Sequence, residues 1–111
     1  MPDVPLLARI VLTTAADPEE AANLARTLVE EQLAACVTLI PAVRSIYRWQ
    51  GKVEDSTETM LLIKTGAEQL PDLEARIHAL HTYDTPEFLV LGVDAGSAGY
   101  LDWLMASLSK A

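Results

Sequence analysis

The chain has 111 residues, of which 8 are basic and 16 acidic, giving a net charge of −8, and half of its side chains are apolar. This length predicts one domain over residues 1–111. The negative charge argues against nucleic acid and anionic membranes as partners. It is compatible with cation binding, but it is more simply explained as solubilising surface.

The start of the chain does not look like a targeting segment. No basic region precedes the first apolar segment, which ends early at Asp17. We therefore expect neither a signal peptide nor a membrane span, and we expect a cytoplasmic protein. A single cysteine, Cys36, excludes an intramolecular disulfide.

The first half of the chain predicts a strand over 6–14 and a helix over 18–34. Asp17 is the expected N-cap of this helix, with Pro18 at the first helical position. Apolar spacing predicts a buried stripe on the helix. It consists of Ala21, Leu24, Ala25, Leu28, Val29 and Leu33.

A long hairpin follows. A strand begins near Cys36, is bent or bulged at Pro41 and ends at a tight turn at Gln50-Gly51, and the return strand covers 52–65. At roughly 3.3 Å per residue such a hairpin reaches about 40 Å, whereas a compact domain of this size has a radius of gyration of about 13 Å. We therefore expect its outer half to pair with another chain.

The remaining segments predict a helix over 67–80, a loop, a strand over 88–94 and a short helix that starts between Gly96 and Gly99. The whole order is β-α-β-β-α-β-α. Two βαβ halves joined by a hairpin describe an α+β fold. It is a ferredoxin-like βαββαβ sandwich with an extra C-terminal helix.

Three ordered motifs carry a family resemblance. The first motif, within 35–52, contains Ala-Cys-Val, a proline, Ser-Ile-Tyr, a tryptophan and Gly-Lys. The second, within 81–87, contains a histidine, a tyrosine and Pro-Glu, and the third, within 100–103, contains Tyr-Leu and a tryptophan. The chain resembles the CutA family, small trimeric proteins linked to divalent-cation tolerance. Thr38, Ala42 and Thr82 stand where Asn, Gly and Pro are usual. The resemblance implies a homotrimer in which strands complete sheets across subunits, which would also protect the edges of the hairpin.

Cys36 and His81 are the candidate metal ligands. A thiolate suits copper, with help from an imidazole, although free cysteines usually behave as small buried hydrophobes. His81 falls in a motif and His78 does not, and a histidine at a helix end can also serve the helix dipole. The resemblance implies copper or another divalent metal ion as the cofactor. Because no local metal motif is present, further ligands would come from a neighbouring subunit, Asp84, Glu87 or water.

A ligand pocket between subunits is the second candidate site. The motifs contain most of the chain's aromatic side chains, and these could line a pocket with a lysine and a glutamate as its polar groups, a composition typical of pockets at interfaces. The predicted lining is Trp49, Lys64, Tyr83, Glu87 and Trp103. The same aromatic residues could instead be interface anchors, as we expect for Tyr47.

No catalytic residues are predicted. Cys36 with His81 could form a nucleophile and base, but the sequence indicates no oxyanion hole. The leading expectation is a non-enzymatic trimer that binds copper or another divalent ion. The alternatives are a sensor of small molecules resembling PII-type regulators, and a structural trimeric scaffold.

Overall fold

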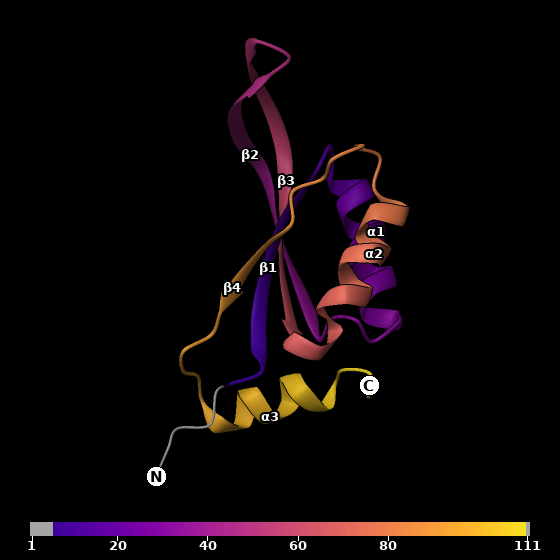
Figure 1. The fold of residues 1–111 in the computed structure, drawn as a ribbon, viewed down its shortest axis with the longest axis vertical. Coiled ribbons are helices and arrows are strands. Elements are labelled where there is room, and N and C mark those ends of the chain that lie inside the picture. The colour runs from indigo at the N-terminus through magenta and orange to yellow at the C-terminus, as the bar shows by residue number, and fades with distance from the viewer. Residues whose placement is uncertain (1–5, 111) are drawn as a thin grey trace.

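The computed structural model describes residues 6–110, which form one antiparallel sheet and three α-helices (Figure 1). The elements are β1 (Ala8–Ala15), α1 (Pro18–Glu30), β2 (Cys36–Trp49), β3 (Lys52–Gly66), the 3-10 helix η1 (Ala67–Gln69), α2 (Leu70–Leu80), β4 (Leu89–Gly92) and α3 (Ala98–Ala106). The predicted order is confirmed, with η1 as the first turn of the predicted second helix.

The sheet has the strand order β2-β3-β1-β4, and all neighbouring pairs are antiparallel. This order is that of a ferredoxin-like sandwich, as predicted. Helices α1 and α2 lie side by side against one face of the sheet (Figure 1). The core lies between these layers, and its largest fully buried apolar side chains are Val11, Leu28, Leu61, Ile63, Leu73 and Ile77.

Helix α1 begins as predicted and ends earlier. Asp17 caps it, with its Oδ1 accepting from the Glu20 backbone N at 2.8 Å. The predicted end at residue 34 is wrong, because Gln32 adopts a left-handed φ of 59°. The next two backbone N–H groups, those of Leu33 and Ala34, then donate back to the carbonyl of Leu28. Such a left-handed residue closes a helix by satisfying its last carbonyls.

Two smaller predictions also fail. Val29 is 40% exposed rather than part of the buried stripe. Strand β4 covers Leu89–Gly92 rather than 88–94, because only these four residues pair with β1.

The hairpin of β2 and β3 extends well beyond the rest of the molecule (Figure 1). Its register shifts between Ile40 and Val43, where Ala42 has a φ of 59°, so Pro41 lies in a bulge. The turn has φ values of 50° at Gln50 and 78° at Gly51, as in a type I′ turn. We call residues 43–58 the arm. Because of it the molecule measures 51 × 29 × 22 Å, with a radius of gyration of 15.0 Å, above the ~13 Å of a compact domain.

The sheet face opposite α1 and α2 remains largely apolar. Register and alternation place Ile10 and Leu12 of β1 on this face, opposite Leu91 and Leu89 of β4. Leu89 and Leu91 are 55% and 47% exposed, and Ile40 of β2 is 41% exposed. We call this surface the open face. Contiguous exposed apolar surface of this kind usually marks an interface.

Candidate functional site

His81 anchors the loop that connects α2 to β4. Its side chain is fully buried. Its Nε2 lies 2.6 Å from the carbonyl oxygen of Thr14, and its Nδ1 lies 3.0 Å from the backbone N of Tyr83. A carbonyl can only accept and an N–H can only donate, so the ring is neutral with its proton on Nε2. Both ring nitrogens are therefore already engaged, and they hold the loop of residues 81–88 beside the end of β1.

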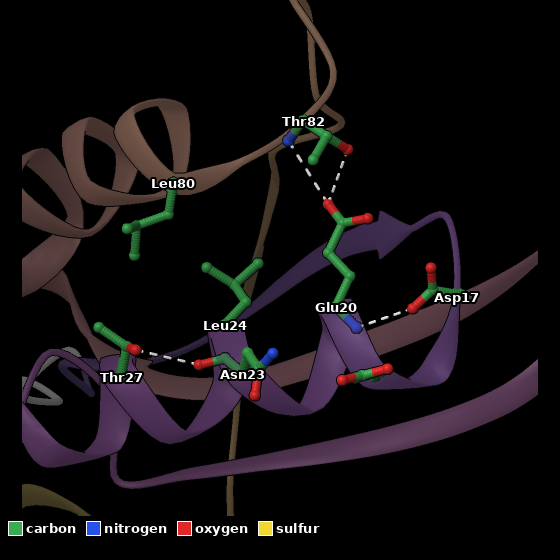
Figure 2. A pocket seen from close by; sticks show the side chains of 8 residues that line it. Asp17, Glu20, Asn23, Leu24, Thr27, Leu80 and Thr82 are labelled. Atoms are coloured by element: carbon green, nitrogen blue, oxygen red, sulfur yellow. Dashed lines mark hydrogen bonds between the residues drawn. The ribbon is translucent and has the colours of Figure 1, made fainter.

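A second contact ties this loop to α1. The Thr82 hydroxyl donates to Oε1 of Glu20 at 2.8 Å (Figure 2). Glu20 and Thr82 belong to a surface groove between α1 and the end of α2, whose other lining residues are Asp17, Glu19, Asn23, Leu24, Thr27 and Leu80. A proline at position 82 could not make this contact, because it has neither a hydroxyl nor an N–H. Thr82 thus departs from the motif and gains a link to α1.

A cleft of about 580 Å³ lies between the arm and the 81–88 loop. We call it the arm cleft. It brings together three of the predicted pocket residues, Trp49, Tyr83 and Glu87. The rest of its lining consists of Thr14, Ser45, Ile46, Tyr47, Glu58, Met60, Asp84 and Thr85.

Tyr83 and Glu58 form the polar link across the arm cleft. The Tyr83 hydroxyl donates to Oε2 of Glu58 at 2.8 Å, and Glu58 is only 8% exposed. Burial, followed by the hydrogen bond to the Glu58 carboxylate, raises the pKa of Tyr83 well above its usual range. Tyr83 therefore stays protonated and donates to Glu58 at neutral pH.

Cys36 and Lys64 lie together at the other end of the open face. They are register partners on β2 and β3, and the Lys64 ammonium is 3.9 Å from the Cys36 sulfur. The same ammonium donates to the hydroxyl of Thr38. Lys64 is therefore not part of the arm cleft within one chain.

Cys36 and His81 are far apart within one chain. Cys36 is level with Ile10 of β1, whereas His81 contacts Thr14, four residues further along that strand. At roughly 3.3 Å per residue this offset is about 13 Å before the width of the sheet is added. Among residues 6–110 no group of three or more histidine, cysteine, aspartate or glutamate side chains could hold a metal ion. A single chain thus does not offer a complete metal site.

Trp103 is a predicted pocket residue that lies outside the arm cleft. It lies on α3, where it packs against Tyr100 with ring centroids 5.5 Å apart. Both side chains are nearly half exposed. Within one chain Trp103 does not line the arm cleft, so any contribution to that site requires a second copy.

Glu58 is the main residue of the cleft that the sequence analysis missed. It belongs to the return strand of the hairpin, and the sequence analysis did not assign it to a site. The signal was the two-residue period of β3, which places Glu58 on the same face as Met60 and Lys64. Its burial depends on the loop that carries Tyr83, which comes from 25 residues away.

The fold and the cleft define a class of small α+β protein with a ferredoxin-like sheet, a projecting hairpin and an exposed sheet face. A family profile described as "CutA1 divalent ion tolerance protein" matches residues 9–107. The chain is 48% identical over 109 residues to "Divalent-cation tolerance protein CutA" of Pectobacterium atrosepticum, covering 97% of this chain and 99% of that protein. This chain belongs to the CutA1 family.

Solved structures of the family share the fold. The structure of the divalent cation tolerance protein from Thermus thermophilus matches with a TM-score of 0.90 and 44% identity, covering 93% of this chain and 100% of that one. CutA1 from Oryza sativa matches with a TM-score of 0.93 and 36% identity, covering 96% and 98%. The names of the family profile and of the two bacterial relatives describe tolerance of divalent cations and state no catalytic activity. None of the helices within residues 6–110 is long and apolar enough to cross a membrane.

Proposed function

We propose that this chain forms a cytoplasmic homotrimer that takes part in divalent-cation tolerance without catalysis. The observation that carries the proposal is the open face together with the arm. Strand β2 forms one edge of the sheet over 14 residues, and β4 forms the other edge with exposed apolar side chains. Long unprotected edges favour pairing with another chain, and a closed ring of three copies would cover edges and face together.

Metal binding, in this proposal, depends on that assembly. Cys36 is half-buried on the open face, so its sulfur can meet ligands from a neighbouring copy. His81 could bind a metal only if it gave up one of its two hydrogen bonds, because a ligating nitrogen needs a free lone pair. We therefore rank Cys36 above His81 as a ligand for copper or another divalent ion.

Two measurements test this function. Analytical ultracentrifugation should give three times the chain mass of 12.1 kDa, and a stable monomer at micromolar concentration would refute the trimer. Calorimetry with Cu(I), Cu(II) and Zn(II) should show weaker binding by Cys36→Ala than by wild type. His78→Ala is the matched control for His81→Ala, since His78 is exposed on α2. Equal binding by all variants would remove Cys36 and His81 from the mechanism.

A second candidate function is that of a small-molecule sensor like the PII-type regulators. The arm cleft favours it, because a cleft with aromatic walls and a few polar groups is typical of ligand sites. A ligand of the native trimer should raise its melting temperature by mass action. A metabolite screen without any stabilising compound would contradict this function.

A further inference from the structure

The arm cleft has the chemistry of a site for an organic cation. We propose that it binds a small primary amine, with the ammonium group at the carboxylates and the alkyl part against the aromatic rings. The carboxylates are Glu58 and Glu87, and the rings are those of Tyr47, Trp49 and Tyr83. This inference goes beyond metal tolerance and does not depend on metal binding.

Glu87 supplies the first observation. Its Oε2 is buried and has no hydrogen-bond partner among residues 6–110. A buried carboxylate oxygen left without a donor is costly, and such groups in native proteins usually have a partner. Glu87 also lines the arm cleft, so a small rotation of its carboxylate toward the cleft would let a donor bound there fill this role.

The charge of the cleft supplies the second observation. Glu58, Asp84 and Glu87 all line it, and its lining contains no lysine or arginine. Glu58 uses Oε2 to accept from Tyr83, but a carboxylate offers about four acceptor positions, so it can accept again. The cleft therefore favours a ligand that carries positive charge and several N–H donors.

The aromatic walls decide which cation fits. Tyr47, Trp49 and Tyr83 present ring surfaces, and a cation near such a ring gains a further attraction. A quaternary ammonium would gain this attraction but has no N–H to give to Glu87. A primary ammonium offers three donors and an apolar chain. It therefore satisfies both the carboxylates and the rings.

Tryptophan fluorescence of the full-length protein can report occupancy. The chain has two tryptophans, so Trp103→Phe leaves Trp49 in the cleft as the only reporter. We would titrate this variant with n-butylammonium chloride in the presence of a chelator, at constant ionic strength. Titrations with n-butanol and tetramethylammonium chloride serve as comparisons. We expect a saturable change with butylammonium, and binding at least tenfold weaker for the other two.

Carboxylate variants made in the Trp103→Phe background locate the site. Glu87→Gln should weaken butylammonium binding by at least tenfold, and Glu58→Gln provides a second test if the first variant folds poorly. Glu68→Gln is the matched control, because Glu68 is exposed on η1 and lies outside the cleft. It should bind butylammonium as the Trp103→Phe parent does.

Several results would overturn the proposal. They are the absence of saturable binding, an equal response to butanol, tetramethylammonium binding as tight as that of butylammonium, or unchanged affinity in folded Glu87→Gln. Another possible occupant of the cleft is the ammonium group of Lys52 at the arm tip of a neighbouring copy. In that case the Trp103→Phe protein would not bind butylammonium, and adding the Lys52→Met substitution would make the cleft available and restore binding. That result would refute a free amine as the ligand. Because a chelator is present, failure of the proposed metal binding would leave all these results unchanged.

Discussion

Replacing His81 with alanine should destabilise the metal-free protein. The substitution removes two hydrogen bonds, one to the carbonyl of Thr14 and one from the backbone N of Tyr83. Thr14 is only 8% exposed, so its carbonyl would lose its partner in a largely dry environment, which costs about 1–3 kcal/mol. The Tyr83 N–H lies in a more exposed loop and is more easily hydrated. With the cavity left by the ring, the total loss is about 2–4 kcal/mol.

Denaturant unfolding in the presence of a chelator, at fixed protein concentration, measures this loss. His78→Ala is the matched control, because it removes the same side chain from an exposed position of α2. Its effect should stay within about 0.5 kcal/mol. If the two variants lost the same stability, His81 would not anchor the loop. If His81→Ala were less stable than wild type only when copper was present, His81 would act as a metal ligand and not as the anchor of the loop.

Three further predictions concern the cleft and the packing. Because burial and then Glu58 raise the pKa of Tyr83, this residue's contribution to stability is present below the ordinary tyrosine pKa of about 10 and lost at higher pH. The difference between ultraviolet titrations of wild type and Tyr83→Phe should show the ionisation of the Tyr83 hydroxyl at a pH above that of an ordinary tyrosine. Glu58→Gln should move this ionisation to lower pH. Gly66→Ala would place a Cβ 2.7 Å from Oε1 of Gln69, a buried side chain that is held in place by its hydrogen bond to the Ser109 carbonyl. Gly92→Ala meets nothing within 4 Å, so thermal melts should show a loss only for the first. Ile77→Ala removes a fully buried side chain and should cost about 2–5 kcal/mol in denaturant unfolding.

Features of the fold that depend on neighbouring residues could be predicted from the sequence. The cap at Asp17 and the turn at Gln50-Gly51 were both correct, because the short-range chemistry of these residues decides them. The end of α1 could not be predicted in this way. Gln32 adopts the left-handed conformation there, although glycine is the usual residue at such a position.

The candidate site was only partly predictable, because it depends on contacts between distant segments. The motifs identified Trp49, Tyr83 and Glu87, which the fold brings into one cleft. The two-residue period of β3 gives the face on which Glu58 lies, but its burial depends on the 81–88 loop, which the sequence does not place beside the arm. The spacing of His78 and His81 suggested a shared helix face, but His81 caps α2 in an extended conformation. Its ring contacts a carbonyl 67 residues away.

The loop beside the arm cleft is held from two directions, and this explains how its sequence can vary. His81 holds it to β1 through Thr14, and Glu20 of α1 holds it through the hydroxyl of Thr82. A proline at position 82 would restrict the backbone instead of making a bond. Both residues limit the conformational freedom of the loop, because proline restricts φ and threonine adds a hydrogen bond to Glu20. What position 82 must provide is therefore a loop that is fixed beside the cleft. Either residue can provide it, so a mismatch with the motif at this position does not imply a different loop.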